Sequence, residues 1–204
     1  MILQSQVGPQ VNSDGIFANV RADRQGGVIV SELNPRYYEN TYRGQKFSAC
    51  LTAAGVIGVL AATNVSYALY NPPSSGKNLV LVAASFAGST TVFGTGAVFF
   101  AYNSQATTPL AGVAVTIKSN LLTGNAAASV AQAFSSATLS ATPIAVRPFF
   151  GAALTATVGS SMPVVKDDIG GEIIVAPGGV LSIQGSTAAV ATGFVGISWD
   201  EVAV

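Results

Sequence analysis

The stretch Val195-Gly196-Ile197-Ser198-Trp199 alternates apolar side chains with small ones at every second position. Successive side chains of an extended strand point to opposite faces, so this period of two predicts a β-strand. Residues 65–70, 113–118 and 181–184 repeat the alternation. The run Leu79-Val80-Leu81-Val82 is apolar on both faces, which predicts a central strand covered on both sides.

Short turn signals separate these runs, for example Asn71-Pro72-Pro73 and Pro177-Gly178-Gly179. Many short strands with frequent turns are typical of a β-sandwich or jelly roll, and we expect an all-β fold of this kind. Residues 126–137 offer a helical alternative, in which Val130 and Phe134 would share one face.

Charge is scarce and unevenly placed along the 204 residues. Only 9% of residues are charged, against about 25% in typical soluble domains, and the net charge is zero. Half of these charges lie within residues 1–50. The shift predicts an N-terminal arm, residues 1–46, followed by a sandwich body, residues 47–204. A body with so little charge for its outside suggests a surface covered by partner subunits.

The arm carries the signature of one short helix. Asn34 is a suitable N-cap, Pro35 suits the first helical position and Gly44 suits the left-handed end. Tyr38 and Tyr42, four residues apart, would lie on one side of this helix.

A cluster of aromatic and basic residues surrounds this helix, and we predict that it forms a protein interface. Residues of these types anchor protein interfaces, although the tyrosines can equally pack the helix onto its own body. Aromatic residues beside cations also stack on single-stranded nucleic acid, but the chain has no basic excess, and no nucleic-acid partner is expected. The predicted interface residues are Arg36, Tyr37, Tyr38, Tyr42, Arg43 and Lys46.

The composition argues against catalysis and against a resident metal or cofactor. The chain has no histidine, which removes the commonest general base and metal ligand. Its single cysteine, Cys50, has no histidine to activate it, and we interpret it as a small buried side chain. We predict no enzyme activity and no cofactor, catalytic residue or metal ligand.

Two local patterns have a chemical alternative that we consider weaker. The group Asp167, Asp168 and Glu172 contains the carboxylates of a glycosidase or a weak Ca²⁺ site, but an acidic turn between strands explains it better. The string Ser74-Ser75-Gly76-Lys77 fits a serine–lysine hydrolase only in its spacing, and a hairpin loop is the simpler interpretation. A pair at the end, Asp200-Glu201, is interpreted as a charged strand end that discourages edge pairing.

A membrane partner is not expected. Residues 47–70 carry no charge and have the length of a spanning helix, which needs about 20 apolar residues. Polar residues and two glycines interrupt the stretch, so two strands, or a short helix and a strand, are the better prediction. The start of the sequence lacks the basic and apolar regions of a signal peptide.

Several segments resemble a loosely defined set of small virion proteins of tailed phages. The resemblance spans most of the chain in short patterns: Asn34-Pro35-Arg36-Tyr37-Tyr38-Glu39, Arg43-Gly44-Gln45-Lys46-Phe47, Leu69-Tyr70-Asn71-Pro72-Pro73-Ser74-Ser75-Gly76-Lys77-Asn78-Leu79-Val80-Leu81, residues 173–179 and Ser198-Trp199-Asp200-Glu201-Val202. It implies a jelly-roll-like domain that forms oligomers, often homotrimers, and decorates the outside of a capsid as a cement protein.

The resemblance implies a major capsid protein and further copies of the chain as partners. It places the chain on the virion surface after synthesis in the host cytoplasm. The alternative function is a host-surface module of a phage head or tail fibre that binds glycans.

Overall fold

The computed structural model describes residues 5–6, 20–21, 35–89, 96–104, 111–122, 128–152, 164–187 and 192–204. The chain divides into two compact units, Met1–Glu39 and Asn40–Val204. In the first unit, β1 (Ser5–Gln6) pairs in parallel with β2 (Val20–Arg21). The second unit holds the sandwich, and it begins before Lys46, the residue at which we expected the arm to end.

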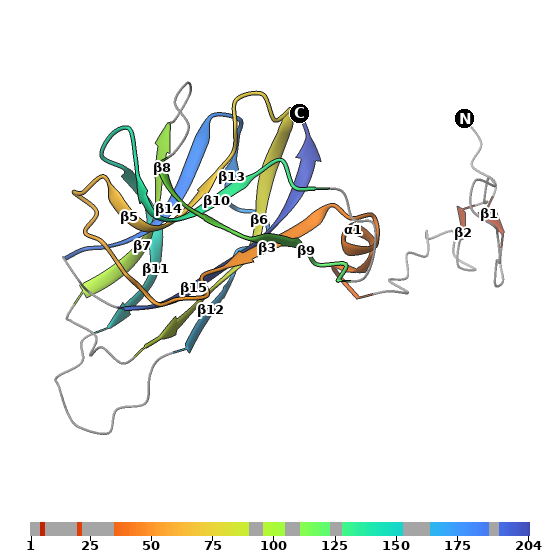
Figure 1. The fold of residues 1–204 in the computed structure, drawn as a ribbon. Helices are drawn as coiled ribbons and strands as arrows, with labels where there is room; N and C mark the ends of the chain where they lie inside the picture. The colour runs from red at the N-terminus through yellow and green to blue at the C-terminus, as the bar shows by residue number, and fades with distance from the viewer. Residues whose placement is uncertain are drawn as a thin grey trace. The chain divides into compact units, whose positions relative to one another are not determined.

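The second unit is an all-β sandwich of two antiparallel sheets, as predicted (Figure 1). The strands of the first sheet lie in the order β11 (Ile144–Ala152), β7 (Gly96–Ser104), β14 (Gly179–Gly185), β5 (Asn64–Tyr70), β10 (Gln132–Thr138) and β8 (Ala111–Val115).

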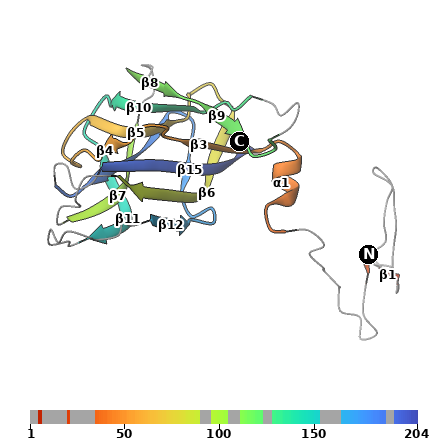
Figure 2. The same ribbon diagram turned by 60° about the horizontal axis from the view of Figure 1, so that its bottom comes forward.

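The second sheet is built around its two longest strands, which pair with each other along most of their length. Its order is β12 (Val164–Asp168), β6 (Lys77–Gly88), β15 (Thr192–Ala203), β3 (Lys46–Cys50) and β9 (Ile117–Ser119), with β13 (Ile174–Val175) on β6 and β4 (Gly55–Val56) on β15. Figure 2 shows β15 between β3 and β6.

The main core fills the space between the sheets. Val195, Ile197 and Trp199 are buried on β15, as their alternation predicted, and Trp199 stacks on Phe47 of β3 with 6.4 Å between ring centroids. The first sheet adds buried residues such as Leu69.

A second, smaller apolar cluster uses the alternate residues of the same first-sheet strands. Ala68 and Tyr70 of β5 and Val180 of β14 pack there with Leu139. The alternation in residues 65–70 therefore does not mark one buried and one exposed face, because β5 is buried on both faces from Val65 to Tyr70.

One predicted strand serves both sheets. The predicted alternation of residues 113–118 holds in part, because Val115 and Ile117 are half-buried while Val113 is exposed. The chain crosses at Thr116 from β8, which pairs with β10, to β9, which pairs with β3.

The helical alternative for residues 126–137 was wrong over the part that the structure describes. Residues 132–138 form β10, because β5 and β8 on either side satisfy its backbone hydrogen bonds. Ser136 has a φ of 50°, and the pairing of β10 with β8 shifts its register there.

The predicted arm helix exists but is shorter than its signals suggested. α1 spans Tyr38–Tyr42, and the amide of Tyr38 donates to the carbonyl of Pro35 at 2.8 Å. Gly44 has a φ of 69°, the left-handed conformation expected of a residue that ends a helix. The predicted cap, Asn34, lies outside the described residues.

Residues 47–70 form β3, β4 and β5, which confirms strands in that stretch. Over the ranges described above, no helix has the length and apolar character needed to cross a membrane.

Close packing at the β15–β6 contact gives a testable prediction. A Cβ at Gly193 would meet the carbonyl oxygen of Ala87 and would lie 2.5 Å from Cζ of Phe86. We expect Gly193→Ala to lower the free energy of unfolding in urea by about 1–3 kcal/mol, a typical cost of overpacking. Gly151→Ala is the matched control, because the nearest atom lies 3.8 Å away. Equal stability of the two variants would contradict the described packing.

Candidate functional site

Asp200 and Glu201 are buried, which overturns the interpretation of this pair as an exposed strand end. Asp200 is 8% exposed and Glu201 is 2% exposed. The physical reason is the position of β15, which pairs with β3 on one side and β6 on the other. Carboxylates in such a place need hydrogen bonds or positive partners.

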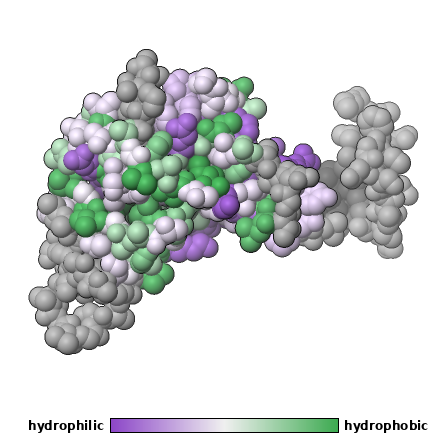
Figure 3. Space-filling view, viewed as in Figure 1, coloured by the Kyte–Doolittle hydropathy of each residue, from purple (hydrophilic) through white to green (hydrophobic). Residues whose placement is uncertain are grey.

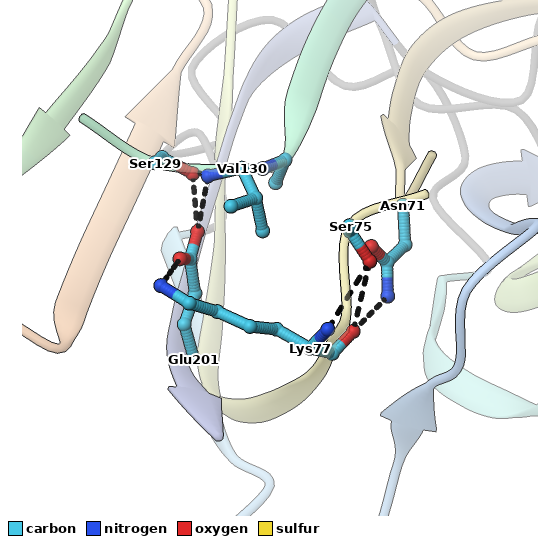
Figure 4. A network of polar contacts seen from close by, with 7 residues as sticks. Asn71, Ser75, Lys77, Ser129, Val130 and Glu201 are labelled. Atoms are coloured by element: carbon cyan, nitrogen blue, oxygen red, sulfur yellow. Dashed lines mark hydrogen bonds and ion pairs between the residues drawn. The ribbon is translucent and has the colours of Figure 1, made fainter. Parts of the chain in front are cut away.

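Glu201 accepts three hydrogen bonds from different parts of the chain. Its carboxylate accepts from Nζ of Lys77 at 2.9 Å, from the hydroxyl of Ser129 at 2.5 Å and from the amide of Val130 at 2.9 Å (Figure 4). The backbone amide of Glu201 donates to the carbonyl of Gln45 at 2.9 Å. Glu201 therefore fastens the loop before β10 and the start of β6 to β15.

Asp200 binds the segment that leads from α1 into β3. Nδ2 of Asn40 donates to its carboxylate at 2.9 Å, and Nζ of Lys46 lies 3.5 Å from the other carboxylate oxygen. The amide of Gln45 also donates to the carbonyl of Asn40 at 2.9 Å. Residues 40–46 are thus tied to β15 at both ends, and we call them the anchor segment.

The predicted interface residues fall into two groups. Lys46 is buried in β3 against Asp200, so its side chain belongs to the anchor rather than to an outer surface. The helix presents its tyrosines to solvent, with Tyr38 46% and Tyr42 65% exposed. Arg36 and Arg43 are exposed as well, and the guanidinium of Arg36 lies 5.1 Å from the ring centroid of Tyr37.

The outer face of the second sheet is a surface that sequence reasoning missed. Small side chains with no charge occupy it across three neighbouring strands, and a shallow hollow of about 250 Å³ lies over them and reaches Lys166 of β12 at its border. We call this the small-residue face: Ala83, Ser85, Gly196, Ser198, Ser48 and Cys50. The sequence contained a sign of this face, because the alternate residues Gly196 and Ser198 in the stretch 195–199 are small.

The hydropathy of the surface agrees with the low charge. On the face seen in Figure 3, hydrophilic residues are scattered and hydrophobic ones lie between them. Large apolar side chains that remain exposed include Val113 on β8, Ile144 on β11 and Val164 on β12, all on strands at the edges of the sheets.

A larger hollow of about 600 Å³ separates residues 48–55 from β8, and we call it the β3–β8 notch. Cys50 lies here and is exposed, so its interpretation as a buried side chain was wrong, because it points from the outward side of β3. The hydroxyl of Ser66 also lines the notch, although this residue is only 8% exposed.

Tyr67 lies near the notch and is fully buried. Burial raises the pKa of its phenol well above the usual range, and Cys50 adds to the rise. The hydroxyl therefore stays protonated, and it donates to the carbonyl of Ala49 at 3.4 Å.

The acidic group does not assemble into a pair of free carboxylates. Asp167 accepts from Arg147 at 2.8 Å, and the same guanidinium lies 3.8 Å from Glu172. Within the part of the chain that the structure describes, no three side chains of His, Cys, Asp or Glu are grouped so that they can hold a metal ion.

The serine–lysine string is engaged in local structure. The Ser75 hydroxyl bonds to the backbone of Lys77, and the ammonium of Lys77 bonds to Glu201 (Figure 4). Gly76 between them has a φ of 63°. The interpretation of this segment as a hairpin loop was wrong, because β5 before it and β6 after it belong to different sheets and do not pair.

Comparison of the chain with protein-family models, curated proteins and solved structures finds no match.

The buried carboxylate gives a second prediction. We expect Glu201→Gln to lower the free energy of unfolding by about 1.5–3 kcal/mol, because bonds to a charged acceptor are lost in a buried place. Glu172→Gln is the control, since the Glu172 side chain is 74% exposed and its ion pair is long. Its cost should stay below about 1 kcal/mol. Urea unfolding measures both, and a larger loss in the control would refute the role given to Glu201.

Proposed function

We propose that this chain is a non-enzymatic structural subunit that forms a homotrimer and binds the outer surface of a virus capsid as a decoration, or cement, protein. The observation that carries the proposal is the small-residue face. A solvent-facing sheet of a monomer usually displays polar or charged side chains in alternation. This face displays small uncharged ones across β6, β15 and β3, and the charged residue that lines the same hollow, Lys166, lies at its border on β12.

Small side chains allow close approach of a second flat surface with good complementarity. Further copies of the chain are the proposed occupants, because a closed oligomer covers the same patch on every subunit. The exposed apolar residues at the sheet edges favour such covering, since uncovered edges promote uncontrolled pairing.

The helix supplies the proposed contact with the major capsid protein. Tyr38 and Tyr42 are exposed, and Arg43 beside them adds a cation. Tyrosine and arginine are enriched among residues that dominate binding energy in interfaces. The anchor segment holds the end of this helix against β15 through Asn40 and Gln45.

The glycan-binding alternative has less support. It predicts exposed aromatic side chains around a hollow in the body. None of the described residues that line the β3–β8 notch is aromatic.

Particles of the encoding virus provide the direct test of the proposal. Purified particles should contain the chain at a fixed ratio to the major capsid protein, and particles lacking it should take it up to saturation. Particles that never retain the chain would overturn the capsid assignment.

Self-association gives a third prediction. Ser85→Lys places a charge on the small-residue face at an exposed position, so we expect a shift from trimer towards monomer in light scattering. Ser74→Lys adds the same charge to an exposed turn away from this face and should leave the trimer intact. A wild-type chain that remains a monomer at all concentrations would contradict the proposal.

Capsid attachment gives a fourth prediction. Tyr42→Ala removes a side chain that is 65% exposed, so stability should change little while the affinity for particles falls at least about tenfold, as for an interface anchor. Tyr102→Ala is the matched control, because Tyr102 is an exposed tyrosine on β7. Cosedimentation with particles measures both, and equal affinities would remove the helix from the interface.

A further inference from the structure

The β3–β8 notch lies where the two sheets of the sandwich separate. At Thr116 the chain passes from β8 of the first sheet to β9 of the second, and residues 113–116 line the notch. Ser135 and Ser136 of β10 line it beside them, and residues 48–55 form the other wall. Cavities that bind small molecules commonly measure about 300–1,000 Å³, and the notch, at about 600 Å³, falls within this range.

The inner part of the notch is apolar because it reaches the main core. Ala49 and Leu51 line the notch, and they are core residues with exposures of 3% and 5%. Val115 lines it from β8 and packs against the same core cluster. We call these three residues the floor of the notch. An alkyl group that contacts the floor is removed from water, which is favourable by the hydrophobic effect.

One positive charge lines the notch without a counter-ion. Lys118 of β9 is exposed, and it is the single charged residue among the described residues that line the notch. Within the part of the chain that the structure describes, its ammonium makes no ion pair or hydrogen bond. Hydroxyl groups are provided by further lining residues, which are Ser48, Thr52, Ser66, Thr116, Ser135 and Ser136. This combination favours an anion, and a carboxylate accepts hydrogen bonds from both kinds of group.

We propose that the β3–β8 notch is a binding site for a small aliphatic carboxylate. The ammonium of Lys118 pairs with the carboxylate, and the alkyl chain lies on the floor. An exposed ion pair contributes little free energy, so the alkyl chain supplies most of the affinity and the charge selects the head group. One copy of the sandwich contains the whole site. The inference therefore goes beyond the proposed function and does not depend on it.

Cys50 reports directly on occupancy of the notch. It is the single cysteine of the chain, it is exposed and it lines the notch. A bound ligand shields its thiol, so we expect butanoate, hexanoate and octanoate to slow its alkylation by iodoacetamide in a saturable manner. Each CH₂ group that becomes buried should lower the Kd by up to about fourfold, so octanoate should bind most tightly of the three.

The contribution of the charge is measured with ligands and variants that differ in charge alone. Octanol and octylamine match octanoate in chain length, and both should protect Cys50 several-fold more weakly at equal concentration. Lys118→Gln should raise the Kd of octanoate about threefold to fivefold, as expected for the loss of a partly exposed ion pair. Lys166→Gln is the matched control, because Lys166 is also an exposed lysine but lies on β12, outside the notch. It should leave the Kd unchanged.

Three results would each overturn the proposal. The first is the absence of saturable protection by octanoate, and the second is octanol that protects as well as octanoate. The third is an equal effect of Lys118→Gln and Lys166→Gln on the Kd. Urea unfolding shows whether both variants remain folded. If Lys118→Gln fails to fold, the comparison of octanoate with octanol on the wild-type chain still decides the question.

The same assay separates a bound ligand from a bound copy of the chain. Alkylation of Cys50 that is slow without added ligand and becomes faster on dilution would show that another copy covers the notch, which would refute the ligand site. A chain that forms trimers and binds particles, but is not protected by octanoate, would refute the ligand site alone. A monomeric chain that ignores particles, but is protected by octanoate, would refute the capsid role alone.

Discussion

The burial of two adjacent carboxylates at the end of β15 constrains the rest of the sandwich. A carboxylate away from water must be paired or hydrogen-bonded, because desolvation of an isolated charge is very unfavourable. Asp200 and Glu201 meet this requirement with partners from the anchor segment, the start of β6 and the loop before β10. These partners are far apart in sequence, so satisfying the pair brings the starts of β3 and β6 and the loop before β10 to the end of β15.

Because buried carboxylates need partners, they engage some of the few charged side chains of this chain. In the sandwich, Lys46 and Lys77 pair with these carboxylates, and Arg147 pairs with Asp167. Charges used in this way contribute little to the outside. Charged residues stand at the borders of the small-residue face, where Lys166 of β12 pairs with Ser85 and Lys118 of β9 pairs with Ser48, while its centre carries small uncharged side chains. The low charge of the chain is thus linked to its proposed assembly role, because several of its few charged side chains form ion pairs within the sandwich.

The fold class could be predicted from the sequence. Features that depend on contacts between residues far apart in the sequence could not. Alternation in residues 195–199 correctly indicated a strand with a buried face, and Gly44 correctly marked a helix end. The burial of Asp200 was not predictable from local pattern, since its partner Lys46 lies 154 residues away. Residues 132–138 have a composition compatible with a helix, and only the neighbouring strands determine that they pair as β10. The small-residue face needed the same knowledge, because its members come from three strands.

The place of β15 between β3 and β6 has a consequence for biogenesis. Each flanking strand lacks its neighbour on one side until β15 leaves the ribosome, although β3 is made early and β9 and β12 precede β15 in the chain. Until then two apolar strands of the nascent chain carry unpaired backbone along that side. Pairings between such distant segments form slowly, and the waiting intermediate is prone to aggregation. Chaperones are thus expected to bind this polypeptide before it completes its folding.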